Sequence, residues 1–407
     1  MKVLFRRIHL YLALAAGFVF FVQCLTGTVL VFEEEITQLL HSERYTVSVP
    51  AGQPRLPLAQ LATQLQQATP KAKLLGFKVY ADPARTVELS FRDGKARPAG
   101  PPPGEGRGGG EGGPGEGRGP GKGRPERGST AFVNPYTGQE LGLQTEKQLP
   151  VFKVAEDLHR RLLAGGVGKA LTGLSALFIL IITATGLVLW WPKTRAVLTG
   201  RLRIKWGASG KRLNHDLHIV LGFYCSLFLF GLALTGVIMS YRWATQGLFQ
   251  LTGTKPTVGI AAPVSAAAAG SPRTVAYDAA LRTGQATYRG AEFWRLSAPK
   301  DSVAAVAVSA PSPLPLRHQG LDTLFVDRRT GAALGQHLYS RQSAGAQLRR
   351  LTKPLHTGEI GGIWTKLLAL VVTLASLTFP VTGVLLWLNR IRKKPRQRGP
   401  VKAMEVA

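Results

Sequence analysis

Residues 10–32, LYLALAAGFVFFVQCLTGTVLVF, form a run without a charged side chain that is long enough to cross a lipid bilayer as a helix. Further apolar runs occupy residues 217–241 and 363–389, and residues 170–191 form a fourth that includes threonine and glycine. A helix crosses a hydrocarbon core of roughly 30 Å in about 20 residues. The four runs therefore predict an α-helical membrane protein with four transmembrane helices.

The basic residues of the chain lie beside the ends of these runs. The 407 residues include 51 Lys and Arg against 23 Asp and Glu, which gives a formal net charge of +28. Basic residues are concentrated before the first run, between the second and third, and after the fourth. By the positive-inside rule these three segments, and with them both termini, face the cytoplasm. The charge is thus a signal of membrane topology, and we expect no nucleic-acid partner.

The two cysteines, Cys24 and Cys225, both lie inside predicted spans, so the sequence has no disulfide framework. The absence of a CxxCH motif excludes covalent c-type haem attachment but leaves non-covalent haem open. No A-x-A pattern follows residues 10–32, so this run is predicted to remain as an uncleaved span.

This topology leaves two external segments, residues 33–158 and 242–355, each predicted to be a small α+β domain. Helices are expected at residues 56–69 and 274–283, and strands at residues 73–81, 86–92, 292–297, 303–309 and 323–327. Residues 130–142 are expected to form a strand, a turn and another strand. Residues 94–128 are almost entirely Gly, Pro, Arg and Glu and are predicted to be a disordered insertion. The other divisions are transmembrane helices at residues 1–32, 159–192, 213–241 and 356–390, a basic cytoplasmic loop at 193–212 and a basic cytoplasmic tail at 391–407.

The two external segments share a motif. Residues 130–142 and 323–335 both read T-x-F-V-[ND]-x-x-T-G-x-x-L-G, without a gap. A strand that ends in Asn or Asp, followed by Thr-Gly, is typical of a β-hairpin turn, so the motif itself is interpreted as structural.

The spans repeat as well, because each carries a Thr-Gly pair at a fixed distance from a histidine. The interval is 17 residues from His9 to Thr26 and from His218 to Thr235, and 26 residues from His159 to Thr185 and from His356 to Thr382. The chain is therefore interpreted as two copies of a unit that consists of a span, an external domain and a second span. Because each copy starts and ends on the cytoplasmic side, the copies form a parallel internal duplication about an axis along the membrane normal. This axis predicts two facing histidine pairs: His9 with His218 near the cytoplasmic boundary, and His159 with His356 near the outer boundary.

Two facing imidazoles suit the two axial positions of a haem iron. The predicted cofactor ligands are therefore His9, His218, His159 and His356, while no catalytic residue is assigned. His215 lies one helical turn before His218 and is the alternative inner ligand. A lone histidine in such a place is more often structural, but repetition at four equivalent positions favours ligation. Zinc is disfavoured because neither carboxylates nor thiols accompany the pairs.

Three further histidines, His41, His318 and His337, have no counterpart in the repeat and are interpreted as surface residues. Glycines near the histidines and within the spans leave room for a porphyrin, or serve as ordinary contacts between helices.

The constellation resembles the PepSY-associated transmembrane helix family of bacterial inner-membrane proteins, which includes ferric-siderophore reductases. The matching residues are Arg7-Ile-His9, Leu25-Thr-Gly-Thr28, Leu158-His159, Thr185-Gly-Leu-Val-Leu-Trp-Trp-Pro192, His215-Asp-Leu-His218, Leu234-Thr-Gly236, Leu355-His-Thr-Gly-Glu359 and Thr382-Gly-Val-Leu-Leu-Trp387. The hairpins at residues 132–138 and 325–331 look like PepSY repeats. The resemblance implies a multi-pass inner-membrane enzyme with two b-type haems and two external PepSY-like domains. Its implied activity is reduction of ferric iron held by a chelator or siderophore in the periplasm, as part of iron acquisition.

No Gly-rich dinucleotide fingerprint follows a strand, so we expect a separate electron donor, either a quinol or a cytoplasmic reductase. External arginines, Arg273, Arg282, Arg289 and Arg295, are candidates for steering an anionic ferric chelate, or form a solvated basic face. Two alternatives remain open. One is a non-redox membrane protein that binds peptides or regulates a protease, and the other is a transporter of an iron chelate.

Overall fold

The computed structural model describes residues 2–392 except residues 71, 93–128, 144–148, 193, 257–262, 266–274, 302 and 314–319. The insertion at residues 94–128, Arg273, His318 and most of the basic tail lie outside the described residues. The chain forms two compact units. The membrane unit comprises Met1–Glu33, Val151–Thr254 and Leu348–Ala407, and the sheet unit comprises Glu34–Pro150 and Lys255–Gln347.

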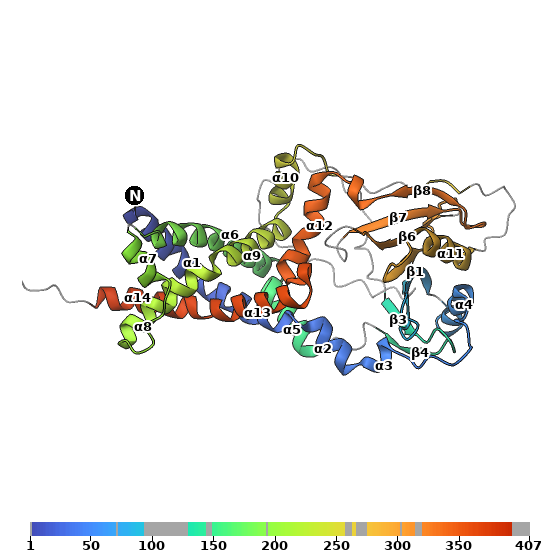
Figure 1. Ribbon diagram of the computed structural model, residues 1–407, viewed down its shortest axis with the longest axis horizontal. Helices are drawn as coiled ribbons and strands as arrows, with labels where there is room; N and C mark the ends of the chain where they lie inside the picture. Colours follow the sequence, from blue (N-terminus) through green and yellow to red (C-terminus); the bar gives the residue numbers. More distant parts are fainter. Residues whose placement is uncertain are drawn as a thin grey trace, which may run out of the picture. The chain divides into compact units, whose positions relative to one another are not determined.

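Four long apolar helices make up the membrane unit, which confirms the prediction of a four-span membrane protein. They are α1 (Lys2–Leu30), α6 (Gly165–Trp190), the continuous helix α8–η2–α9 (Gly210–Ser240) and the pair α13–α14 (Ile363–Ile391). The helices pack side by side, with α6 against both α1 and α9, and α13 against α1 and α9 (Figure 1). Their outward surfaces are rich in exposed Leu, Val, Ile and Phe, as expected of helices that face lipid.

Two of these helices depart from regular α geometry. The third span is built from α8 (Gly210–Asp216), a π-turn η2 (Leu217–Leu221) and α9 (Gly222–Ser240). The fourth consists of α13 (Ile363–Ser376) and α14 (Thr378–Ile391), which meet at Leu377. Pro380 lies just after this break and supplies no backbone N–H, so the carbonyl of the preceding turn loses its helical partner.

Short helices flank the spans. Between the first and second spans lie α2 (Glu33–Leu40), α3 (Ser42–Tyr45) and α5 (Pro150–Arg161). Between the third and fourth lie α10 (Arg242–Leu251) and α12 (Ala344–Thr357). Helix α7 (Arg195–Arg201) joins the second span to the third. His159 lies on α5 and His356 on α12, so each precedes its span on a separate helix. The chain reverses after α5 through Leu162 and Leu163, both with positive φ, and after α12 through Gly358, whose φ is +78°.

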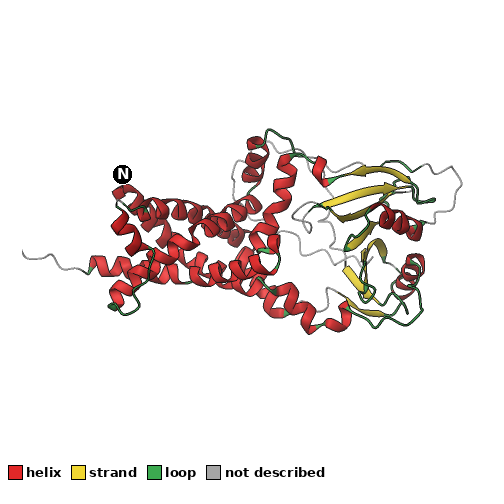
Figure 2. Ribbon diagram, in the orientation of Figure 1, coloured by secondary structure: helices red, strands yellow, loops and turns green. Residues whose placement is uncertain are grey.

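Eight antiparallel strands form one sheet in the sheet unit, in the order β4-β3-β2-β1-β5-β6-β7-β8. Figure 2 draws the strands in yellow and the helices in red. The first external segment supplies β1 (Lys73–Tyr80), β2 (Val87–Arg92), β3 (Ser129–Val133) and β4 (Glu140–Leu143). The second supplies β5 (Phe293–Ser297), β6 (Val306–Pro311), β7 (Leu321–Val326) and β8 (Ala333–His337). The sequence predicts two separate small domains, whereas here β1 pairs with β5, in the register Phe77 with Leu296.

Two helices, α4 (Leu58–Ala68) and α11 (Tyr277–Thr287), cover one face of the sheet and pack against each other. Their apolar residues join the inward-facing residues of β1, β2, β5 and β6 in one hydrophobic core. Phe77 and Leu296 lie at its centre with at most 1% of their surface exposed. Along β2 and β6, buried and half-buried residues alternate, as the period of two requires.

The repeated motif forms the turns from β3 to β4 and from β7 to β8. Gly138 and Gly331 adopt φ of +76° and +73°, a conformation that favours glycine. Asn134 Oδ1 accepts the backbone N–H of Tyr136 at 2.9 Å, and Asp327 Oδ1 accepts the N–H groups of Arg329 and Thr330 at 2.9 Å each. The structural interpretation of the motif therefore holds at both turns.

Candidate functional site

The four histidines singled out by the repeated intervals meet in two pairs inside the membrane unit. The ring centroids of His9 on α1 and His218 on η2 are 6.4 Å apart, with an angle of 80° between the ring planes. The rings of His159 on α5 and His356 on α12 are 6.0 Å apart, with an angle of 67°. All four rings are half-buried. The structure thus places the histidines in the facing arrangement that the repeat predicts.

Each histidine Nδ1 lies within hydrogen-bond distance of a threonine from a Thr-Gly pair on a neighbouring span. The pairs are His9 with Thr185 (3.2 Å), His159 with Thr26 (3.1 Å), His218 with Thr382 (2.8 Å) and His356 with Thr235 (3.0 Å). The first and second spans therefore hold each other's histidines, and the third and fourth do the same. Each facing pair takes one histidine from the first two spans and one from the last two.

Backbone carbonyls fix which ring nitrogen carries the hydrogen. Nδ1 of His9 lies 3.1 Å from the carbonyl oxygen of Ile182, and Nδ1 of His159 lies 3.0 Å from that of Gln23. Nδ1 of His356 lies 3.1 Å from the carbonyl oxygen of Leu232. A carbonyl can only accept a hydrogen bond, so Nδ1 must donate. In a neutral imidazole, Nε2 is then left with its lone pair.

The threonine hydroxyls lead to the same conclusion. Each hydroxyl donates to a carbonyl of its own helix four residues earlier, at 2.7 to 2.8 Å; the acceptors are Val22, Ile181, Gly231 and Thr378. With its hydrogen used in this way, the threonine oxygen accepts from Nδ1. Among the residues that the structure describes, no hydrogen bond to Nε2 of these four histidines is found.

The glycine of each Thr-Gly pair lies against the ring that its threonine holds. A β-carbon built on Gly186 would stand 3.2 Å from His9 Cε1. The corresponding distances are 3.4 Å for Gly27 to His159, 3.4 Å for Gly383 to His218 and 3.6 Å for Gly236 to His356. Threonine supplies the acceptor and glycine the space, which explains the dipeptide. In the sequence, the constant spacing of the Thr-Gly pairs from the histidines is the signal for this role, although the hydrogen bonds themselves become visible only in the structure.

The donor set fits haem better than a protein-only metal site. Imidazole nitrogens bind first-row metals at about 2 Å, so two rings that share one ion have centroids about 6 Å apart. Both observed separations, 6.4 and 6.0 Å, match this value. No group of three His, Cys, Asp or Glu side chains able to hold a metal occurs in the described part of the chain. Two nitrogens suffice only where a macrocycle supplies the other ligands, as porphyrin does for haem iron.

His215, the alternative inner ligand, takes a different position. Its side chain is 48% exposed, and its Nδ1 lies 3.4 Å from the carboxylate of buried Asp216, which also accepts from Arg212 at 2.8 Å. A cavity of about 250 Å³ opens beside this cluster. The geometry therefore favours His218 as the partner of His9. His41 lies 3.5 Å from Glu43, and His337 is on β8, so neither joins a pair.

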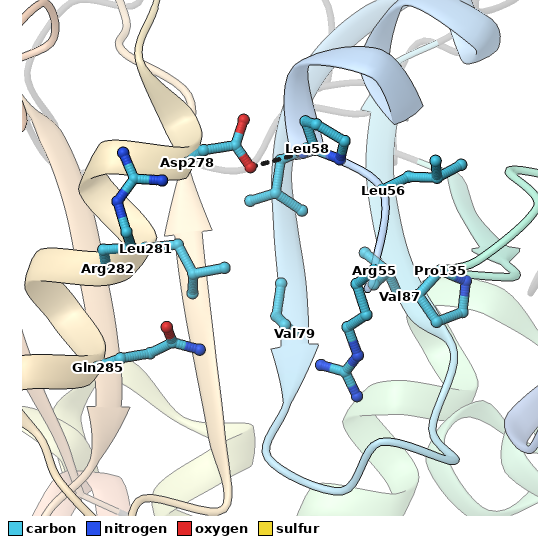
Figure 3. Close-up of a pocket in the computed structure, with 11 residues that line it drawn as sticks. Arg55, Leu56, Leu58, Val79, Val87, Pro135, Asp278, Leu281, Arg282 and Gln285 are labelled. Atoms are coloured by element: carbon cyan, nitrogen blue, oxygen red, sulfur yellow. Dashed lines mark hydrogen bonds between the residues drawn. The ribbon is translucent and has the colours of Figure 1, made fainter. Parts of the chain in front are cut away.

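A second candidate site is a cavity of about 450 Å³ in the sheet unit, between the start of α4 and the exposed side of α11 (Figure 3). Val79 and Leu281 line its apolar part, and Arg55 and Gln285 approach it from opposite sides. Arg55 also donates to the carbonyl of Tyr80 at 2.8 Å.

Of the arginines proposed to steer an anionic chelate, only Arg282 among the described ones lines this cavity. Arg295 lies on β5, where it stacks 6.0 Å from the Phe293 ring, and Arg289 is exposed beyond the end of α11. Asp278 closes one end of the cavity, where its carboxylate accepts the N–H of Leu58 at 2.8 Å.

A four-span membrane unit with two facing histidine pairs, joined in sequence to an eight-stranded sheet, defines the class of this protein. The chain belongs to the PepSY-associated TM region family, whose model matches residues 6–390. No curated protein matches the chain.

Proposed function

We propose that the protein is a di-haem b reductase of the bacterial inner membrane, which carries electrons outward and reduces ferric iron held by a chelator or siderophore in the periplasm. The observation that carries this proposal is the pair of facing imidazoles at each site, with Nδ1 of every ring bound and Nε2 left as the donor atom. Membership of the family supports a membrane protein of this class.

Histidines, threonines and glycines have different roles in the proposed haem sites. His9 and His218 would hold one haem, and His159 and His356 the other. The threonines orient the rings, and the glycines let them approach the neighbouring helix. Haem held by these histidines would supply one-electron transfer.

The direction of transfer follows from the proposed topology. By the positive-inside rule, the basic segments beside the span ends support cytoplasmic termini and a periplasmic sheet unit. The two halves of the chain are interpreted as copies from a parallel internal duplication, because both have the same order of span, helix, strands, helix and span.

The acceptor and the donor are separate molecules. In the sheet unit, the cavity lined by Arg55 and Arg282 supports binding of an anionic ferric chelate, since two guanidinium groups favour carboxylate or other anionic oxygens. Electrons enter from a quinol or a cytoplasmic reductase, because the chain carries no dinucleotide-binding fingerprint.

An absorbance spectrum of the purified protein, oxidised and dithionite-reduced, tests the proposal. We expect sharp low-spin b-type bands and about two haems per chain after haem-replete expression. A colourless protein would overturn the proposal. A haem-loaded protein that fails to reduce ferric chelates would instead show that the cofactor assignment holds and the substrate assignment does not.

A further inference from the structure

Three of the four paired histidines are held by two acceptors, and one is held by a single acceptor. Nδ1 of His9, His159 and His356 each bonds both a threonine hydroxyl and a backbone carbonyl. His218 bonds Thr382 at 2.8 Å, and Thr382 is its sole hydrogen-bond partner among the residues that the structure describes. The support of the inner pair is thus unequal, although the four sequence motifs look alike.

The local backbone around His218 and Thr382 differs from that around the other three pairs. In α6 the carbonyl of Ile182, three residues before Thr185, accepts from both the threonine hydroxyl (3.0 Å) and His9. The corresponding residue before Thr382 is Phe379, which lies between the break at Leu377 and Pro380. Its ring packs edge-on against His218, with centroids 5.9 Å apart. On the other side, His218 belongs to the π-turn, where the helix is wider than a regular α-helix.

A single acceptor has a chemical consequence for a metal ligand. A neutral imidazole carries its hydrogen on either nitrogen, and the hydrogen bond at one nitrogen decides which nitrogen is free to bind metal. For three of the histidines, a carbonyl that belongs to the backbone enforces Nδ1–H whatever side chain stands nearby. For His218, this choice depends on one hydroxyl group.

We propose that Thr382 is the positioning residue that sets the tautomer and orientation of His218 toward iron. A side chain would thus control His218, whereas backbone carbonyls secure the other three ligands. This inference rests on the proposed haem function. The Nδ1–H···Oγ1 bond keeps Nε2 unprotonated and aimed away from α14. Loss of the hydroxyl leaves His218 without a described partner, free to rotate or to carry its hydrogen on Nε2.

The test compares two isosteric substitutions in the full-length protein. Thr382→Val removes the acceptor that His218 has among the described residues, whereas Thr26→Val, the matched control, leaves His159 bonded to the Gln23 carbonyl at 3.0 Å. Second-shell partners of metal-bound histidine are worth about 10–100-fold in affinity. We therefore expect Thr382→Val to weaken retention of one haem by about that factor and to shift its reduction potential. Thr26→Val should weaken haem retention by less than tenfold and leave the reduction potential unchanged, and Thr382→Ser should restore the wild-type behaviour.

The measurements are the haem-to-protein ratio, an optical redox titration and the low-spin electron paramagnetic resonance spectrum. If the haem proposed for His159 and His356 is retained with its wild-type potential, the Thr382→Val variant still folds. Equal effects of Thr382→Val and Thr26→Val, or no effect of Thr382→Val on haem retention and potential, would overturn the assignment of Thr382 while leaving the reductase proposal intact. A wild-type protein without haem would overturn both.

Discussion

At the scale of single residues, the glycine beside each threonine sets how closely a histidine approaches the neighbouring helix. Gly186→Ala places a methyl group 3.2 Å from His9 Cε1, tighter than ordinary contact, so the ring must move. We expect the variant to lose one of the two proposed haems, as measured by the haem-to-protein ratio. Weakening of the helix cannot explain such a loss, since alanine favours a helix over glycine by about 1 kcal/mol.

Gly222→Ala is the matched control for Gly186→Ala. Gly222 also lies in a span, at the start of α9, but a β-carbon there meets nothing within 4 Å. The control should retain both haems. If Gly186→Ala retains them as well, the contact with His9 does not govern the position of the ring.

The paired histidines and their supporting residues differ in how far sequence reveals them. Regular intervals to Thr-Gly were enough to select His9, His159, His218 and His356 from eight histidines. The same intervals did not reveal that threonine accepts from the ring, because that bond joins residues 121 to 176 positions apart and depends on how the helices pack. The intervals also favoured His218 over His215, and the structure adds that His215 is half-exposed beside Asp216 while the ring of His218 faces His9.

At the scale of elements, the two copies of the hairpin turn differ in the residue that accepts the backbone N–H groups of the turn. Asp327 takes the place of Asn134, and its carboxylate accepts from the Ser265 hydroxyl and from the backbone N–H and hydroxyl of Thr330. The Ser265 hydrogen bond and the backbone N–H groups hold the pKa of Asp327 well below its ordinary value of 3.8.

This depressed pKa predicts an acid-sensitive turn between β7 and β8. Because the folded pKa is lowered, Asp327 contributes stability that is fully present above about pH 4 and is lost as the pH falls further. We expect the protection of backbone amides at the β7–β8 turn, measured as hydrogen exchange relative to the intrinsic rate at each pH, to fall below pH 4. Protection at the β3–β4 turn, where Asn134 does not titrate, should lack this acid-dependent step. Asp327→Asn should remove the pH dependence and weaken the turn by about 1–3 kcal/mol, since hydrogen bonds to a charged group are lost. An unchanged pH profile in Asp327→Asn would contradict this role.

Most elements of the sheet unit follow from local patterns, but the joining of its halves does not. Alternating residues predicted the strands and amphipathic stretches predicted α4 and α11, within a few residues of the observed bounds. The pairing of β1 with β5 brings Phe77 next to Leu296, and no turn or spacing connects two strands so far apart in sequence. The π-turn at Leu217–Leu221 also has no local signature, whereas Pro380 does mark the break in the fourth span.

At the scale of the whole molecule, the hydrogen bonds of the histidines run within each half of the chain, while the facing pairs run between the halves. His9 and His159 are held by the first two spans, and His218 and His356 by the last two. Iron at either pair would therefore link the two halves. The supports of one pair involve none of the residues that support the other, so the two sites should fill independently.

Independent filling predicts which haem each substitution removes. His159→Ala or His356→Ala deletes a ligand of one pair, yet leaves His9 and His218 with their threonine partners. We expect either variant to keep one haem, with an unchanged reduction potential in an optical titration. His9→Ala and His218→Ala should remove the complementary haem. His215→Ala, which changes a half-exposed residue bonded to Asp216, should keep both. Loss of both haems in every variant would contradict two separate sites, and loss of the inner haem in His215→Ala but not in His218→Ala would transfer the ligand assignment to His215.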